Sequence, residues 1–208
     1  AVKSIVENNI YGLDIDERAA QLAYFSVMMK GRQYDSRFFR RGVQPHVYAI
    51  VESNHVNEFA LDYFCNGDVK LKSAMDTIIN ELYDAKEYGS IITVSQQDWS
   101  ALYARLDEIE EEVSLYKESV LNEIKPLIQV AEALAQKYDA VVTNPPYMRN
   151  RGMNNQLLKF VKKNYEPYKA DMYAIFIKRS KKFLKKYGLM AMIAQHSFMF
   201  LSSFSALR

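Results

Sequence analysis

Cysteine is almost absent from this chain of 208 residues, which contains Cys65 alone. A single thiol cannot close an internal disulfide, so a disulfide scaffold is excluded. The three histidines, His46, His55 and His196, are not spaced like metal ligands, and no metal is expected. Hydrophobic runs are shorter than the roughly 20 residues needed to cross a bilayer, and the N-terminus has no signal pattern. We therefore expect a cytoplasmic protein with no membrane partner.

The net charge of +2 hides a strong segregation of charge along the chain. Residues 52–139 contain 18 acidic and 7 basic side chains, whereas residues 149–187 contain 2 acidic and 12 basic ones. Such a basic segment attracts a polyphosphate backbone through counterion release, although a solvated helix face is the simpler interpretation. The cations assigned to the basic segment are Lys159, Lys162, Lys163, Lys178, Arg179, Lys181, Lys182, Lys185 and Lys186.

The chain begins with a pattern typical of a strand, a tight turn and a helix. Residues 9–16 are largely apolar and end in carboxylates, and apolar residues then recur at helical spacing from Ala19 to Val27. Asp16 stands where an N-cap belongs. A second short strand is expected at residues 47–51, before a polar group that begins with Glu52.

Residues 54–136 are expected to form a mainly helical, acidic insertion, with a break near Gly89 and a stop at Pro126. Six apolar residues in it follow alternating steps of four and three, which predicts one amphipathic helix that packs on its own domain. These residues are Leu102, Leu106, Ile109, Val113, Tyr116 and Val120.

Strands and helices alternate again in residues 137–208. Residues 138–143 are predicted to be a buried strand, and residues 171–184 a helix that Gly188 ends near the C′ position. A fully apolar strand is expected at residues 189–194.

This alternation at both ends of the chain predicts an α/β fold with a parallel sheet and right-handed crossovers. Residues 1–53 and 137–208 are then two parts of one core, separated by the insertion. Ligands bind beyond the carboxyl ends of such strands. Three strand ends carry polar residues suited to that position, and we expect them to converge.

The most informative strand end is the tetrad Asn144-Pro145-Pro146-Tyr147. Two consecutive prolines remove two backbone donors and hold the chain extended, so the carbonyls of Asn144 and Pro145 are not drawn into a helix. Asn144 adds a side-chain acceptor and Tyr147 adds a flat apolar face. A planar ligand with an amino group fits this arrangement, because two acceptors take its N–H bonds while its ring stacks on tyrosine.

The tetrad resembles motif IV of the amino-methyltransferases that use S-adenosylmethionine, and residues 11–16 resemble their motif II. The resemblance implies a partial Rossmann-like fold in which Asp14 accepts from the ribose hydroxyls and Ile15 packs on the cofactor adenine. Glu52 is our choice for the polar residue near that adenine, with Ser53 and Asn54 as alternatives. His196 and Phe198 follow a strand end that resembles the border of the target-base pocket.

Longer sequence segments at residues 16–23 and 195–200 look similar to one branch of the family, the adenine methyltransferases of BREX-type phage-defence systems (PglX-like). Type IIG restriction-modification enzymes form a related branch. The resemblance implies N6-adenine methylation of double-stranded DNA, with other defence proteins as possible partners. In this reaction a flipped adenine stacks on Tyr147, and Asn144 and the Pro145 carbonyl hold its N6.

The chain departs from this family in its glycines, because none of the seven is close enough to another to form the glycine-rich turn of motif I. We therefore expect an internal fragment that lacks the first strand and is inactive by itself. Two alternatives remain open. One is a protein-glutamine N5-methyltransferase, which uses a similar tetrad to hold a carboxamide nitrogen. The other is a non-catalytic module that binds DNA or assembles with a partner.

Overall fold

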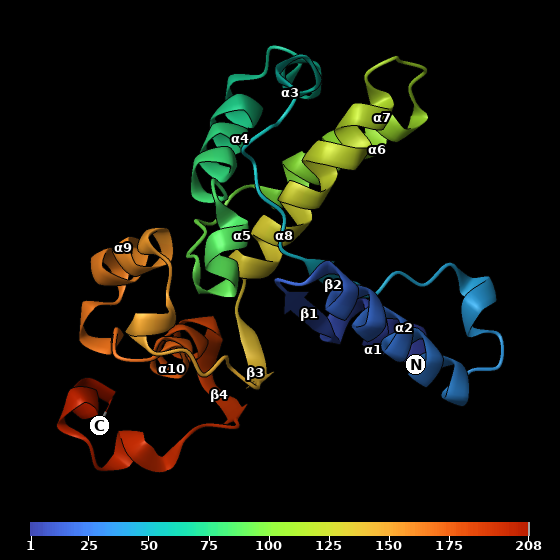
Figure 1. The fold of residues 1–208 in the computed structure, drawn as a ribbon. Coiled ribbons are helices and arrows are strands. Elements are labelled where there is room, and N and C mark those ends of the chain that lie inside the picture. Colours follow the sequence, from blue (N-terminus) through green and yellow to red (C-terminus); the bar gives the residue numbers. More distant parts are fainter. Residues whose placement is uncertain (208) are drawn as a thin grey trace. The chain divides into compact units, whose positions relative to one another are not determined.

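The computed structural model describes residues 1–207, which fold into two compact units (Figure 1). The first unit is Ala1–Leu134 and the second begins at Ala135. The helical residues from 54 onward therefore group with residues 1–53, and their status as a separate insertion stays a prediction. Within residues 1–207, no helix is both long and apolar enough to span a membrane.

The first unit contains the predicted strand, turn and helix. Its opening elements are α1 (Val2–Asn9), β1 (Tyr11–Asp14), α2 (Glu17–Tyr34) and β2 (His46–Ala49). The carboxylate of Asp16 caps α2, because it accepts from the backbone N–H groups of Arg18 at 2.7 Å and Ala19 at 3.1 Å. Strands β1 and β2 pair in parallel, with Asp14 opposite Ala49. The predicted parallel pairing is confirmed here.

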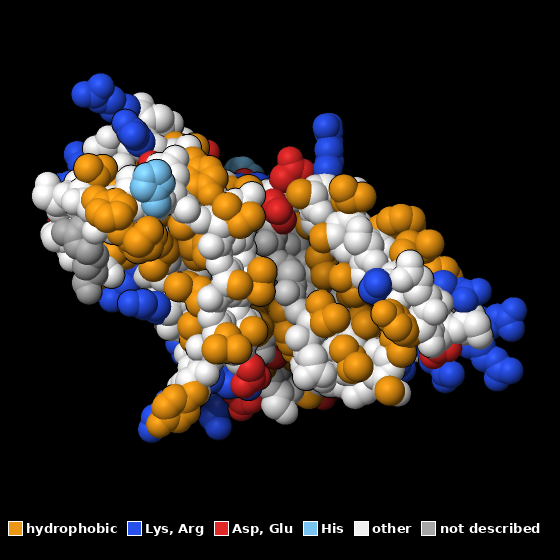
Figure 2. All heavy atoms as spheres, turned by 90° about the horizontal axis from the view of Figure 1, so that it is seen from below, with side chains coloured by type: hydrophobic (Ala, Val, Ile, Leu, Met, Phe, Trp, Pro, Cys, Tyr) orange, Lys and Arg blue, Asp and Glu red, His pale blue; other side chains and the backbone are white. Residues whose placement is uncertain are grey.

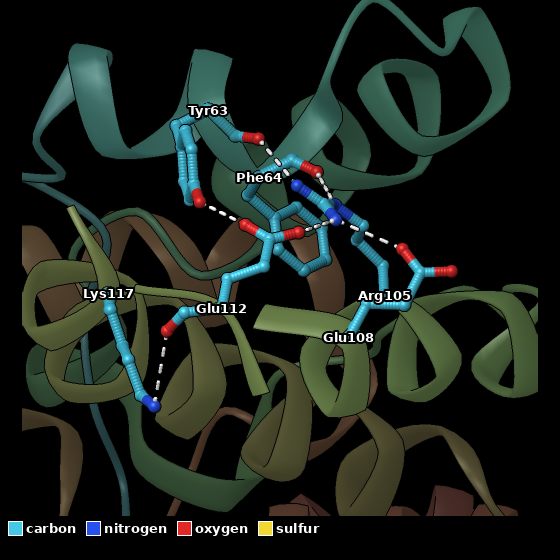
Figure 3. A network of polar contacts seen from close by, with 6 residues as sticks. All are labelled: Tyr63, Phe64, Arg105, Glu108, Glu112 and Lys117. Carbon is cyan, nitrogen blue, oxygen red and sulfur yellow. Dashed lines mark hydrogen bonds and ion pairs between the residues drawn. The ribbon is translucent and has the colours of Figure 1, made fainter. Parts of the chain in front are cut away.

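The remaining elements of the first unit are helices, as expected. They are α3 (Glu58–Cys65), α4 (Val69–Glu81), α5 (Ala85–Tyr88), α6 (Trp99–Glu111), α7 (Lys117–Ser119), a π-helix (Val120–Ile124) and α8 (Lys125–Ala135). Arg105 joins α6 to α3, since its guanidinium donates to the Phe64 carbonyl at 3.0 Å and the Tyr63 carbonyl at 3.3 Å (Figure 3). The same group pairs with Glu108 at 3.0 Å and Glu112 at 2.9 Å.

The predicted amphipathic helix through Val113 and Tyr116 is wrong. Helix α6 ends at Glu111, and Val113 lies fully exposed beyond it, whereas Ile109 is fully buried. Several carboxylates stand near this end of the helix, where the macrodipole disfavours negative charge. The Glu112 side chain also turns back to Arg105, and its backbone is extended.

The predicted stop at Pro126 is also wrong. Pro126 lies in the first turn of α8, which follows the π-helix without a break. A proline has no N–H to donate to the preceding turn, and a wider π turn is one way for a helical chain to accommodate that loss.

The second unit contains β3 (Tyr138–Thr143), α9 (Asn155–Asn164), α10 (Met172–Phe183) and β4 (Leu184–Met192). Strands β3 and β4 pair in parallel, with Thr143 opposite Met192. The carboxylate of Asp171 caps α10 by accepting from the backbone N–H of Tyr173 at 3.4 Å. The described residues thus form two two-stranded parallel sheets, one in each unit.

Two expectations for the second unit are wrong. The helix predicted at residues 171–184 is observed as α10, but Gly188 does not end it, because this glycine lies inside β4 where the register with β3 shifts. A Cβ atom at Gly188 would stand 3.2 Å from the carbonyl oxygen of Asp139, so close approach of the two strands explains the glycine.

The strand β3 is not buried. Val142 is 78% exposed and Leu189 of β4 is 74% exposed. Helix α10 packs against this two-stranded sheet, and the side chains of Ala140 and Val142 point to the side of the sheet that faces solvent. Exposed hydrophobic side chains are visible at many points on the face shown in Figure 2.

Candidate functional site

The tetrad Asn144–Tyr147 lies directly after the carboxyl end of β3. Pro145 is buried, whereas Asn144 is exposed and Tyr147 is 46% exposed. The proline anchors the loop while the residues on either side of the Pro-Pro pair keep their side chains accessible. A loop that binds a planar ligand needs an accessible amide and an accessible ring, and Asn144 and Tyr147 supply them.

The hydroxyl of Tyr147 joins this loop to the end of the neighbouring strand. It donates to the carbonyl of Ile193 at 2.8 Å, one residue past β4, and the backbone N–H of Ile193 donates to Thr143 at 3.4 Å. The ring of Tyr147 stands 6.2 Å from the ring of Tyr173 in α10. The structure therefore places the loop beside the strand end before His196. The family resemblance implied that both regions border the target-base pocket.

The start of α10 holds the other side of the loop. The backbone N–H of Met172 donates to the carbonyl of Met148 at 2.9 Å, and Arg149 forms an isolated antiparallel bridge with the buried Asp171. Three elements therefore fix the tetrad: β3 before it, β4 beside it and α10 after it.

His196 and Phe198 differ in their surroundings. His196 is exposed, and its ring stands 6.3 Å from that of Phe200. Phe198 is half-buried and packs on the cluster of Tyr173, Ala174 and Phe204. Contact with a substrate stays a prediction for both residues, and the ring of Phe198 supports the core of the unit as well.

Tyr173 is the residue of this site that sequence reasoning did not select. It is fully buried, its ring lies between those of Tyr147 and Phe204, and its hydroxyl is 3.0 Å from the hydroxyl of Ser197. An aromatic residue two positions after an N-cap aspartate was visible in the sequence, but nothing there showed that it would pack beneath Tyr147.

In the first unit, the carboxyl ends of β1 and β2 carry the residues predicted to bind the cofactor. The Asp14 carboxylate accepts from the backbone N–H of Asp16 at 2.9 Å, and Ile15 is 50% exposed. Ser53 is buried and donates to the carbonyl of Ile79 at 2.6 Å, while the Asn54 amide donates to Asp84 at 2.6 Å. The side chains of Ser53 and Asn54, the two alternatives to Glu52, therefore form hydrogen bonds with the helical segment.

A cavity of about 620 Å³ opens beside these strand ends. Ile15 lines it, and so does Val51, the residue before Glu52. Asp14 lies one residue before Ile15. Asp16 and Glu17 supply carboxylates to its lining, whereas Asp14 and Glu52 each adjoin a lining residue. An open, partly apolar space with carboxylates has the chemistry required by an adenine and a ribose, so the residues present fit an adenosine group.

The basic segment is less uniform than its sequence suggests. Arg179 is buried, with its guanidinium 3.8 Å from the centre of the Phe183 ring, and burial lowers the pKa of Arg179 to about 10. Lys185 pairs with Asp139 at 2.8 Å. The pKa of Lys182 is lowered by partial burial and then by the neighbouring cations Arg179, Lys178 and Lys137.

The exposed lysines of the basic segment lie on two helices and one strand, with Lys185 and Lys186 on β4. Lys159, Lys162 and Lys163 belong to α9, whereas Lys181 and Lys182 belong to the last turn of α10. Helix α10 has 12 residues and is therefore about 18 Å long, with its first turn at the tetrad loop. The α10 lysines consequently lie at the end of that helix far from Asn144.

Comparison with known proteins matches residues 8–208 to a family described as Eco57I restriction-modification methylase. The chain is 39% identical over 229 residues to the "Adenine-specific methyltransferase BrxX" of Escherichia coli O9:H4 (strain HS), a match that covers 98% of this chain and 19% of that protein. It is 36% identical over 215 residues to the "Adenine-specific methyltransferase PglX" of Lacticaseibacillus casei (strain Zhang), covering 100% of this chain and 18% of that protein.

A shorter match is 36% identical over 66 residues to the "Type II methyltransferase M.BstVI" of Geobacillus stearothermophilus, covering 31% of this chain and 12% of that protein. The chain spans less than one fifth of the length of these curated relatives.

Proposed function

Because the chain belongs to the Eco57I restriction-modification methylase family, we propose that the protein carrying it is a DNA adenine-N6 methyltransferase of phage defence or restriction-modification. The observation that carries the proposal is the tetrad loop, with Asn144 and the ring of Tyr147 accessible at the end of β3. Two long matches to proteins named adenine-specific methyltransferases favour adenine over glutamine as the target.

The loop would hold the target base after it leaves the duplex, since a base inside the stack is out of reach. The side-chain oxygen of Asn144 and the carbonyl of Pro145 accept the two N–H bonds of N6, and the base stacks on Tyr147. These acceptors favour a tetrahedral, positively charged nitrogen over the flat ground state, which lowers the barrier to attack by N6.

S-adenosylmethionine, when bound, supplies an activated methyl group, so orientation of the two reactants accounts for much of the rate. Asp14 would accept from the ribose hydroxyls, Ile15 would pack on the adenine, and Glu52 would lie at the adenine edge. The cavity lined by Ile15 and Val51 supports this assignment. Double-stranded DNA would be bound in part by the exposed lysines of the basic segment, and other defence proteins are proposed as partners.

Replacing Asn144 by Ala in the complete protein tests the proposal. We expect loss of methyl transfer to DNA, because N6 loses one of its acceptors, with DNA affinity nearly unchanged. Asn150→Ala, an exposed asparagine six residues further on, is the matched control and should retain activity. Transfer of radiolabelled methyl groups to duplex DNA and to a glutamine-containing peptide is the measurement. Full activity of Asn144→Ala, or labelling of the peptide alone, would contradict the proposal.

A further inference from the structure

The cavity at the ends of β1 and β2 has walls from two parts of the chain. Residues 15–18 and 47–51, from the two strand ends and the start of α2, form one part. The other part comes from the helices, with Lys86 of α5 and Pro126, Gln129 and Val130 of α8. A helical segment that the sequence marks only as an insertion thus lines the same space as Ile15.

One close contact joins the helical segment to Ile15, and one hydrogen bond holds α8 within that segment. A Cβ atom at Gly89 would stand 3.3 Å from Cδ1 of Ile15, so the helical segment touches Ile15 through bare backbone. Helix α8 is tied to α6, because the hydroxyl of Tyr103 donates to Glu132 at 2.7 Å. Burial and this hydrogen bond raise the pKa of Tyr103, which keeps its hydroxyl protonated as a donor. Helix α8, which carries most of this second wall, is therefore packed into the first unit.

The face of α8 that lines the cavity has a definite chemistry. Pro126, Gln129 and Val130 are spaced by three and four residues, so they lie on one side of the helix. Two apolar side chains therefore flank one half-buried amide, which has both a donor and an acceptor. An adenine edge offers the complementary pair, an amino donor beside a ring-nitrogen acceptor, and its ring faces are apolar.

We propose that the helical segment completes the adenosine pocket of the cofactor, and that Gln129 binds the Watson–Crick edge of the cofactor adenine. This inference rests on the proposed function, since it takes the cavity to be the cofactor site. Gln129 then determines selectivity for adenine at the cofactor, separately from Asn144, which binds the target adenine.

Calorimetric binding of S-adenosylhomocysteine to the complete protein tests this role. Gln129→Ala is expected to weaken binding roughly three- to tenfold, the effect of one or two hydrogen bonds. The analogue with hypoxanthine in place of adenine should bind the unaltered protein more weakly, and Gln129→Ala should reduce that preference. Gln129→Glu keeps the side-chain shape and should also weaken binding, because a carboxylate cannot donate to the ring nitrogen.

Asn122→Ala is the matched control, because Asn122 is an exposed amide two turns earlier on the same helical run. It should leave both affinities unchanged, and thermal unfolding should verify that each variant is folded. Unchanged affinity and preference in the Gln129 variants would overturn this inference and leave the proposed function intact. Failure of the unaltered protein to bind S-adenosylhomocysteine at all would overturn both.

Discussion

Tyr147 has two separable roles in the candidate site, one for its ring and one for its hydroxyl. The hydroxyl donates to the carbonyl of Ile193, and the half-exposed ring remains free on one side for stacking. The ring also stands near Tyr173, which is fully buried beneath it. The loop is thus positioned by the end of β4 as well as by its own two prolines.

These two roles predict different losses for two variants of Tyr147. Tyr147→Ala removes the stacking surface and should lower kcat/KM for DNA methylation roughly 10- to 100-fold, since base stacking on an aromatic ring is worth about 1–3 kcal/mol. Tyr147→Phe keeps the ring and loses only the bond to Ile193, so a loss of about tenfold or less is expected. Steady-state kinetics on duplex DNA distinguish them, and equal losses in both variants would contradict the stacking role.

Glu112 illustrates how one carboxylate can make stability depend on pH. The hydroxyl of Tyr63 and the guanidinium of Arg105 both donate to it (Figure 3) and hold its pKa below the ordinary value of 4.5. A lowered folded-state pKa adds stability above the unfolded-state pKa, and this stability is lost as the pH falls through the folded-state value.

Glu112→Gln should therefore make the free energy of unfolding less dependent on pH in the acid range below about pH 5. Urea unfolding at a series of pH values is the measurement. Glu111→Gln, which changes the adjacent exposed carboxylate, is the control and should preserve the steeper dependence of the unaltered protein. An identical pH dependence in the two variants would show that Glu112 is not the group responsible.

The end of α6 shows how a periodic pattern can continue past the helix that it predicts. Leu102, Leu106 and Ile109 are buried as their spacing indicates, but the helix ends at Glu111 and Val113 lies in solvent. The spacing alone could not reveal this end, because it depends on the Glu112 side chain turning back toward Arg105.

Two alanine substitutions test this boundary. Ile109→Ala removes a fully buried side chain and should lower the free energy of unfolding by about 2–5 kcal/mol, because a cavity remains. Val113→Ala should change it by less than about 0.5 kcal/mol, as expected for an exposed site. Urea unfolding monitored by circular dichroism provides both values. A comparable loss at Val113 would mean that the helix continues through it.

The net charge of the whole chain is small, yet residues 149–187 of the second unit contain 12 basic and only 2 acidic side chains. Of the nine cations named in the basic segment, Arg179 is buried against Phe183 and Lys185 is paired with Asp139. Lys181 and Lys182 lie at the end of α10 far from the tetrad loop. We therefore propose the three exposed lysines of α9 for the phosphate contacts.

Replacing Lys159, Lys162 and Lys163 together by Gln should weaken DNA binding and reduce its dependence on salt. If all three contact phosphates, the slope of log K against log salt concentration should fall by about 2.7. Fluorescence anisotropy with a labelled duplex at several salt concentrations measures this slope. Replacing Lys70 and Lys72 by Gln removes two charges from the acidic helical segment and is the control, which should leave the slope unchanged. An unchanged slope would place the DNA contacts elsewhere.

Local chemistry in the sequence predicted much of the fold and of the candidate site. Asp16 caps a helix, the strands pair in parallel, and the tetrad follows a strand, because N-caps, proline geometry and β-branched runs act within a few residues. The helix end at Glu111 and the position of Gly188 inside β4 were not predictable in this way. They depend on contacts between residues distant in sequence, such as Arg105 with Phe64 and Gly188 with Asp139.

The sequence by itself determined the chemistry of the tetrad and the family to which the chain belongs, because both depend on short runs of adjacent residues. Only the tertiary structure decided that Tyr173 lies beneath Tyr147, that Arg179 is withdrawn from solvent, and that Gln129 shares a cavity with Ile15. The physical reason is that burial and shared cavities arise from packing between distant segments, which no local pattern records.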